Sequence, residues 1–413
     1  MLAFAVAGVT IAINRGNVFL DLAFYGRWAS NTLSAVAIPY ADFKWEYPPA
    51  ALPGMMPPAL LSAPFPTWNY VPYTLAWVAM VLLLDAVILR TLVRRLGADL
   101  KQPALQLWIL GLPILGGLSW ARFDLLPATA ALAAVLYAGS RREVSSGLVA
   151  GLGACLKLWP ILLAPIQRTR RRSLTAASVA VGFVVAIALT TFQLTGSTGF
   201  SQVLGYQSDR GLQIESLAAL PLVWMHHLEI GGIDTRFAFG AWEVTGAGVP
   251  MLARIATVVF LASLVLVGLA HWRLMRVDAG RRGVAITAVT MMLVILVTNK
   301  VFSPQYVLWL IAVVVAAAAL DPSTWRPFVK PVLLLAALTH VVFPWFYGDV
   351  LFGAWFGLLV MTARDVVLVW LLVKVVRLLW TEVRSVRDRE VLMAASGLNV
   401  DDVTGTDQVL RLP

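Results

Sequence analysis

Long apolar stretches recur along the whole chain and are separated by short polar or basic segments. A bilayer core about 30 Å thick needs about 20 apolar residues per helix, and fewer where a helix is buried among others. We therefore predict membrane spans near residues 1–13, 68–89, 103–120, 125–139, 174–194, 251–272, 283–299, 305–320, 329–346 and 355–376. The first stretch has neither a basic leading region nor a small-residue cleavage site, so we interpret it as an anchor helix.

One further apolar stretch, residues 142–168, has basic residues at both ends and the interruption Lys157-Leu-Trp-Pro160 in its middle. Because proline breaks a helix, this pattern predicts two half-helices that enter and leave the membrane on the same side. Transporters and lipid-handling enzymes place binding sites at such breaks. The expected fold class is an all-α polytopic membrane protein of about 11 membrane segments. Residues 1–380 form a single transmembrane domain, and residues 381–413 form a flexible cytoplasmic tail.

Composition supports one integral membrane unit. Apolar residues make up 60% of the chain and charged residues 13%, whereas a soluble globular chain carries about 25% charged residues. The net charge of +10 does not indicate a nucleic-acid partner, because most basic residues fall in segments on one side of the alternating topology. By the positive-inside rule that side is cytoplasmic, so the plasma-membrane protein has its long loops, 14–67 and 195–250, outside and its C-terminus inside. Anionic membrane lipids are the expected partners of the basic clusters.

The sequence shows no clear metal-binding or nucleotide-binding motif. The single cysteine, Cys155, excludes an intramolecular disulfide framework and a cysteine-based metal site. His226 and His227 are adjacent but lack identifiable further ligands. The chain has no phosphate-binding glycine-rich loop and no second carboxylate pair at ligand spacing, so we expect neither a metal nor a cofactor.

The first outer loop contains the clearest candidate for acid–base chemistry, Asp21. From this residue onward, Tyr25 and Trp28 follow with helical spacing, which predicts an amphipathic helix along the membrane interface. A carboxylate at a partly desolvated interface can accept a proton from a sugar hydroxyl. A helix cap or a plain surface carboxylate is the alternative interpretation.

Several motifs together resemble one known family, glycosyltransferase family 87 of the GT-C fold, which includes polyprenol-phosphate-mannose-dependent mannosyltransferases of actinobacteria. The motifs are Asp21-Leu-Ala-Phe-Tyr-Gly-Arg-Trp-Ala, Pro39-Tyr40-Ala-Asp42-Phe43, Glu46-Tyr47-Pro48-Pro49, Arg122-Phe-Asp124-Leu-Leu-Pro127, Lys157-Leu-Trp-Pro160, Tyr206 through Ser216, Asn299 through Tyr306, and Thr339-His340-Val-Val-Phe-Pro344. They span nearly the whole chain in order.

The resemblance implies an inverting transferase in which Asp21 is the general base. The donor would be a sugar on a polyprenyl phosphate, with mannose favoured, and the acceptor a glycolipid or cell-envelope glycan outside the cytoplasmic membrane. The enzyme is expected to act as a monomer. Further donor- or substrate-binding residues carried over from the motifs are Tyr25, Glu46, Arg122, Asp124, Lys157, Arg210, Glu215, Lys300, Gln305 and His340.

The cations among these residues suit a phosphate that is also the leaving group, since arginine binds phosphate as a fork and lysine as a point charge. Structural alternatives remain open for each. Lys157, costly at membrane depth by roughly 2.5–3.5 kcal/mol, could snorkel or pair with a carboxylate. Arg122 and Asp124 could form an ion pair with each other, and Lys300 could be an interfacial anchor. His340 could contact the donor phosphate, assist Asp21, or be a satisfied core histidine.

Other polar and aromatic positions are weaker candidates. Arg364-Asp365 is interpreted as a buried structural charge pair. Of the 16 tryptophans, Trp309 is assigned to an interfacial aromatic belt, whereas Trp45, Trp224 and Trp242 are candidates for stacking on a sugar.

Three other functions compete with mannose transfer. A polyprenyl-phosphate-arabinose-dependent transferase would present the same phosphate and lipid tail. A lipid or sugar transporter or flippase would also use buried charges and a broken helix, but no inverted repeat is visible. A non-catalytic scaffold would leave the charges unexplained.

Overall fold

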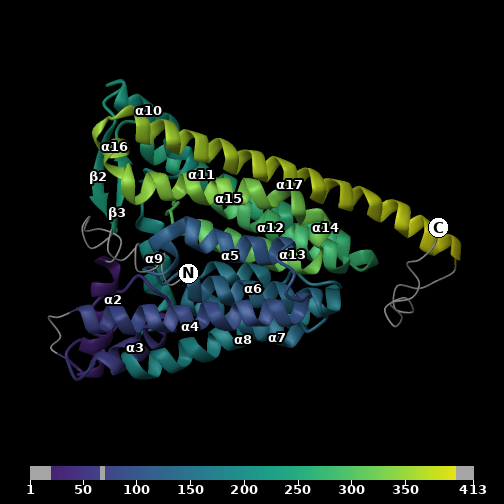
Figure 1. The fold of residues 1–413 in the computed structure, drawn as a ribbon, viewed down its shortest axis with the longest axis horizontal. Coiled ribbons are helices and arrows are strands. Elements are labelled where there is room, and N and C mark those ends of the chain that lie inside the picture. Colours follow the sequence, from purple (N-terminus) through teal and green to yellow (C-terminus); the bar gives the residue numbers. More distant parts are fainter. Residues whose placement is uncertain (1–19, 66–69, 397–413) are drawn as a thin grey trace.

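A computed structural model describes residues 20–65 and 70–396; the predicted first span, 1–13, lies outside these residues. The described chain is a helical bundle with a small sheet (Figure 1). Its helices are α2 (Leu20–Leu33), α3 (Ala51–Ser62), α4 (Tyr70–Leu96), α5 (Pro103–Leu115), α6 (Leu125–Gly139), α7 (Glu143–Leu156), α8 (Arg170–Thr195), α9 (Phe200–Asp209), α10 (Leu220–His227), α11 (Val249–Leu274), α12 (Gly280–Thr298), α13 (Tyr306–Leu320), α14 (Pro322–Trp325), α15 (Val329–His340), α16 (Tyr347–Phe352) and α17 (Trp355–Ser396).

Six helical segments of the described chain are long and apolar enough to cross a membrane: Tyr70–Leu96, Arg170–Thr195, Val249–Val277, Gly280–Thr298, Pro322–Trp345 and Trp355–Val386. They coincide with six of the predicted spans. The helices α5, α6, α7 and α13 are also apolar but have fewer than 18 residues. A multi-pass membrane protein with an α-helical bundle is therefore the architecture.

The centre of the bundle explains why short helices suffice there. Every residue of α13 from Tyr306 to Ala318 is buried, because α5, α6 and α12 pack around it. A helix enclosed by protein has no need to match the full thickness of the lipid. By contrast, α8 and α11 expose most of their apolar surface, as lipid-facing helices do.

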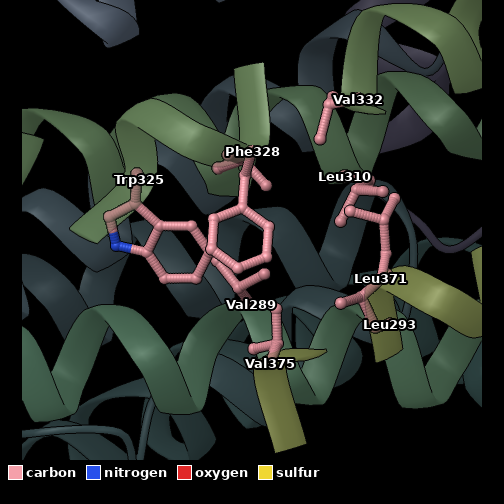
Figure 2. Close-up of a pocket in the computed structure, with 9 residues that line it drawn as sticks. Val289, Leu293, Leu310, Trp325, Phe328, Val332, Leu371 and Val375 are labelled. Carbon is pink, nitrogen blue, oxygen red and sulfur yellow. The ribbon is translucent and has the colours of Figure 1, made fainter. Parts of the chain in front are cut away.

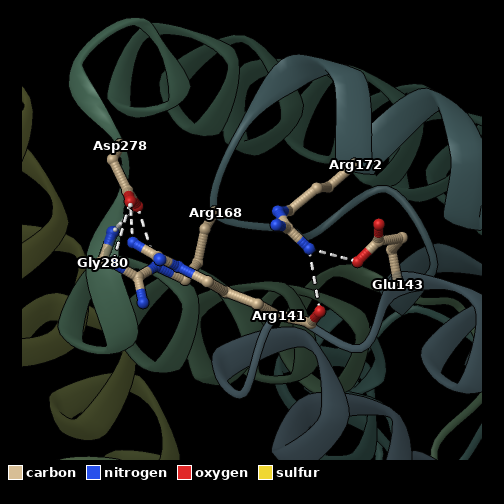
Figure 3. Close-up of polar contacts among 6 residues, drawn as sticks. All are labelled: Arg141, Glu143, Arg168, Arg172, Asp278 and Gly280. Carbon is tan, nitrogen blue, oxygen red and sulfur yellow. Dashed lines mark hydrogen bonds and ion pairs between the residues drawn. The ribbon is translucent and has the colours of Figure 1, made fainter. Parts of the chain in front are cut away.

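The stretch around Lys157 departs from a simple helical pair. Helix α7 ends at Leu156, because the ring of Pro160 would clash with the carbonyl of that residue, four positions earlier. Only a short 3-10 helix, Trp159–Leu163, follows, and the chain then doubles back to the start of α7. There Gln167 donates a hydrogen bond to Ser146 at 2.9 Å, and Arg172 pairs with Glu143 (Figure 3). The return segment is therefore shorter than the predicted second half-helix.

Residues 195–250, named the second outer loop after their predicted location, fold into a compact unit with a three-stranded antiparallel sheet in the order β1-β3-β2. The strands are β1 (Leu212–Gln213), β2 (Asp234–Ala238) and β3 (Ala241–Thr245). The all-α expectation did not include them. The hairpin turn at Phe239-Gly240 has positive φ at both residues, the geometry that two-residue hairpin loops favour. This unit and α2 gather at one end of the bundle, opposite the end of α17 (Figure 1).

Helices also form outside the predicted spans. For example, the apolar helix α3 lies within residues 14–67, the first predicted outer loop, and packs against α2 and α4. Helix α17 continues to Ser396, into the range that was expected to be a flexible tail.

Candidate active site

Asp21 lies in the first turn of α2, where a carboxylate interacts favourably with the helix dipole. The face of α2 beside Asp21 is buried, and Gly26 lets it approach α4 closely, since a Cβ there would come within 2.9 Å of the Tyr73 ring. Close packing therefore fixes α2 and with it the position of Asp21. The Asp21 carboxylate forms an ion pair with Arg122 and keeps 31% of its side chain exposed.

Arg122 reaches Asp21 from the turn between the 3-10 helix Gly116–Ser119 and α6. Its guanidinium carbon lies 5.7 Å from the centre of the Phe343 ring. Burial lowers the pKa of Arg122 to about 10, so the side chain remains charged at neutral pH. Its Nε is buried and has no hydrogen-bond partner among the described residues, which leaves this donor available.

Asp124 and Lys157 form a second ion pair, two residues beyond Arg122. The Lys157 Nζ donates to Asp124 Oδ1 at 2.7 Å, and the Trp309 indole donates to the same oxygen at 2.8 Å. The ammonium also lies 5.0 Å from the Tyr306 ring centre and 4.9 Å from that of Trp309. Arg122 and Asp124 thus have separate partners. The alternative interpretation, an ion pair between these two residues, is wrong.

Aromatic rings enclose the side of the site nearest α2. The hydroxyl groups of Tyr25 and Tyr47 lie 3.2 Å apart, and Tyr25 also contacts the rings of Trp77 and Phe123. Burial raises the pKa of both phenols, so they remain neutral hydrogen-bonding groups. Trp45, a candidate for sugar stacking, is only 3% exposed and packs edge-on against Trp28; Trp28 is the more accessible ring.

A group of polar residues joins the first outer loop to the second. Glu46 lies near Tyr206 of α9. Burial, and then the negative charge of Glu46, raise the pKa of the Tyr206 phenol. The Arg210 guanidinium lies 5.9 Å from the Tyr206 ring centre. Lys300 donates to the carbonyl oxygens of Ser208 and Arg210, at 3.0 and 2.5 Å. Lys300 therefore secures the end of α9, and the loop carbonyls use two of its donors.

The remaining predicted residues lie apart from Asp21 or have fixed partners. Glu215 is buried and binds Arg364 at 2.5 Å. His340 is fully hydrogen-bonded: Nδ1 lies 3.0 Å from the Leu115 carbonyl, and Nε2 accepts from Trp345. These partners correspond to a satisfied core histidine. Gln305 is half-buried just before α13.

Trp224 and Trp242, the other stacking candidates, also have partners. The Trp224 indole donates to Thr362 at 3.1 Å. Trp242 packs edge-on against Phe237.

The structure adds residues that the sequence analysis had assigned elsewhere or had not considered. Trp309 is 3% exposed, so it is a partner of Asp124 and not a belt residue. Its spacing from Tyr306, three residues along one helix, is the signal that could have placed both rings on one face. Phe343 lies in a motif already noted, but its contact with Arg122 joins distant segments.

The described residues contain no cluster of three or more metal-ligating side chains. A recess between α12, α13, α15 and α17 is lined entirely by apolar side chains, Trp325 and Phe328 among them (Figure 2). Without a charged group it offers nothing to bind a phosphate. The paired charges around Asp21 and Lys157 are therefore the candidate active site.

Comparison with known proteins gives one family match. The model of glycosyltransferase family 87 matches residues 45–304. No curated protein and no solved structure matches the chain. The matched stretch covers more than half of the chain and includes Arg122, Asp124 and Lys157, while Asp21 precedes it. The protein is a membrane-embedded glycosyltransferase that belongs to family 87.

Proposed function

We propose that the protein transfers a sugar, with mannose favoured by the sequence resemblance, from a polyprenyl phosphate to a glycolipid or cell-envelope glycan. The reaction inverts the anomeric configuration, and Asp21 is the general base. The observation that carries this proposal is the ion pair between Asp21 and Arg122, with the Lys157–Asp124 pair two residues further along. A partly exposed carboxylate paired with one cation, and a second cation held by Asp124, suit transfer from a phosphate.

In the proposed reaction, the acceptor oxygen forms a bond to the anomeric carbon while the bond from that carbon to the phosphate oxygen breaks. Asp21 takes the proton of the acceptor hydroxyl. The electron pair of the breaking bond passes to the phosphate, which leaves as polyprenyl phosphate. Arg122 and Lys157 stabilise the negative charge that develops there.

The free donors of these two cations support the assignment. Within the part of the chain that the structure describes, the buried Nε of Arg122 has no partner, and Lys157 donates one hydrogen bond of the three that an ammonium can make. A donor phosphate that binds Arg122 would compete with Asp21 for the guanidinium. Binding of the donor would thus release the carboxylate to act as base.

The membrane arrangement belongs to the same proposal. The basic residues favour a cytoplasmic C-terminus and an extracytoplasmic active site in the plasma membrane. The return of the chain after Lys157 supports a re-entrant segment. The four shorter apolar helices would add further membrane segments, which gives about 11 membrane segments in the protein. The enzyme acts as a monomer.

Asp21→Asn tests the role of the base. Purified full-length protein is incubated with radiolabelled polyprenyl-phosphate mannose and a membrane glycolipid extract. We expect the variant to transfer label about 10²–10⁴ times more slowly, as for loss of a general base. Asp234→Asn, at an exposed carboxylate of the second outer loop, is the matched control and should transfer at the wild-type rate.

Equal transfer by wild type and Asp21→Asn would refute the assignment of the base. A parallel reaction with polyprenyl-phosphate arabinose distinguishes the sugars, since use of arabinose alone would replace mannose in the proposal. If the wild-type protein consumes neither donor, the polyprenyl-phosphate proposal fails.

A further inference from the structure

Three arginines from three separate elements converge at the end of the bundle opposite Asp21. Arg95 lies in the last turn of α4, Arg142 directly precedes α7, and Arg281 lies in the first turn of α12. Arg95 donates to Ser140 at 2.8 Å, next to the turn that contains Arg142. Arg142 and Arg281 are each close enough to Arg95 for their positive charges to repel it.

Three nearby arginines, Arg141, Arg168 and Arg172, are neutralised by carboxylates. Asp278 binds Arg168 at 2.8 Å and Arg141 at 3.3 Å, and Glu143 pairs with Arg172 (Figure 3). Within the described residues, Arg95, Arg142 and Arg281 have no ion pair with any carboxylate. Asp278 also accepts from the backbone N–H of Gly280, which holds the start of α12 beside the same turn.

Two of the three charges occupy unfavourable positions. Arg142 and Arg281 lie at the N-termini of helices, where the helix dipole disfavours a cation and attracts an anion. An anion bound among the three side chains would remove both the mutual repulsion and the unfavourable dipole interaction. Backbone N–H groups at a helix start add to this attraction.

An exposed apolar strip runs along α7, the helix that Arg142 directly precedes. Val144, Leu148 and Leu152 follow at intervals of four residues, so they lie on one face of the helix. All three are exposed, at 50%, 44% and 41%. A cationic head site that leads into an apolar strip has the shape of a phospholipid: an anionic phosphodiester above an acyl chain.

We propose that Arg95, Arg142 and Arg281 bind the phosphodiester of an anionic phospholipid, whose acyl chain lies along Val144, Leu148 and Leu152. The arginines provide forked donors for the phosphate oxygens. The strip distinguishes a lipid from free phosphate, which has no apolar part to bury. The site is separate from the proposed sugar-transfer site and does not depend on it.

Native mass spectrometry of the full-length protein in detergent tests the proposal. The probes are phosphatidylglycerol and phosphatidylcholine with identical acyl chains. The test variant is Arg95→Gln/Arg142→Gln/Arg281→Gln. The control, Arg273→Gln/Arg377→Gln/Arg384→Gln, removes the same charge from three exposed arginines on other helices.

We expect wild type and control to retain phosphatidylglycerol in preference to phosphatidylcholine. The test variant should bind phosphatidylglycerol about 100-fold more weakly, because it loses the attraction of three basic residues for the anionic lipid. Should the triple variant misfold, Arg142→Gln alone should lose about fivefold. Equal losses in test and control variants would indicate diffuse surface charge and overturn the site. Displacement of the lipid by millimolar inorganic phosphate would overturn the assignment of a lipid.

Discussion

At the scale of single residues, several contacts fix the position of Lys157. Its ammonium is held by Asp124 and covered by the rings of Tyr306 and Trp309. Asp124 is 2% exposed and accepts from both Lys157 and Trp309, so it has little surface left for a substrate. We infer that Asp124 positions Lys157, and that only Lys157 of this pair contacts the donor phosphate.

Lys157→Met should lower the transfer rate about 100-fold, because it removes a charge that stabilises the leaving phosphate. The variant also leaves Asp124 buried without its cation, which costs stability. The double variant Asp124→Asn/Lys157→Met restores neutrality, so it should regain thermal stability while transfer stays slow. Rates and melting temperatures are measured for both variants, with Lys157→Arg as the charge-conserving control. Recovery of activity in the double variant would refute a catalytic role for Lys157.

Sequence reasoning reached the residues of this site more easily than their pairing. A carboxylate in the first outer loop and cations at helix ends followed from the topology and the motifs. The partner of Asp21 could not be predicted, because Arg122 is far away in sequence and could have paired with either Asp21 or Asp124. The packing of α2 against α4 brings Asp21 to Arg122, and no local sequence pattern indicates this packing.

At the scale of elements, the contact of α5 with α15 depends on one glycine. Gly116 follows α5 with φ of +66°, and a Cβ there would lie 2.1 Å from the His340 ring. The ring in turn bonds the Leu115 carbonyl. The turn at the end of α5 therefore requires both the conformational freedom of glycine and its lack of a side chain.

Gly116→Ala should destabilise the protein by about 2–4 kcal/mol, since it combines a disfavoured backbone conformation with a clash. The expected observation is a lower melting temperature in detergent. Gly182→Ala is the matched control, because Gly182 lies inside α8 with nothing within 4 Å of the added methyl group. It should leave the melting temperature unchanged or raise it slightly. An equal decrease in both variants would contradict this account.

Among the elements, the long apolar helices were predictable, because an apolar stretch of about 20 residues is the length that a membrane-spanning helix needs. The short strands β2 and β3 were not expected, although Phe239-Gly240 lies between residues of high strand propensity. The return after Lys157 was also only partly predicted. Proline fixes where α7 ends, but contacts at the start of α7 determine how the chain returns.

At the scale of the whole molecule, one buried charge cluster ties the second outer loop to α17. Arg364 is completely buried and binds Glu215 at 2.5 Å and Asp365 at 2.9 Å. Its Nη2 also donates to the Glu215 carbonyl at 2.9 Å. The predicted structural pair Arg364-Asp365 is confirmed, and Glu215 makes it a connection between distant parts of the chain.

Arg364→Leu should cost about 3–5 kcal/mol, because it leaves two buried carboxylates without their cation. The melting temperature should fall markedly. The variant Glu215→Met/Arg364→Leu/Asp365→Leu replaces the whole cluster by apolar side chains and should recover most of the loss. If the triple variant melts as low as Arg364→Leu, the unpaired charges are not the cause.

The same cluster makes stability depend on pH. One guanidinium serves two carboxylates, and burial, despite the opposing charge of Arg364, raises the pKa of Glu215 from 4.5 to about 7. Between these values the folded state binds more protons than the unfolded state, so the free energy of unfolding falls as pH rises. This contribution is complete below about pH 4.5 and is lost above about pH 7, with a slope of at most about 1.4 kcal/mol per pH unit.

Glu215→Gln keeps the shape of the side chain but cannot titrate, so its melting temperature should lack this component between pH 5 and 8. Wild type and variant are compared in the same detergent across that range. Other titrating groups cancel in the difference, because both proteins share them. A difference that is flat, or that favours wild type more as pH rises, would mean that Glu215 is already ionised throughout, and that Arg364 outweighs the effect of burial.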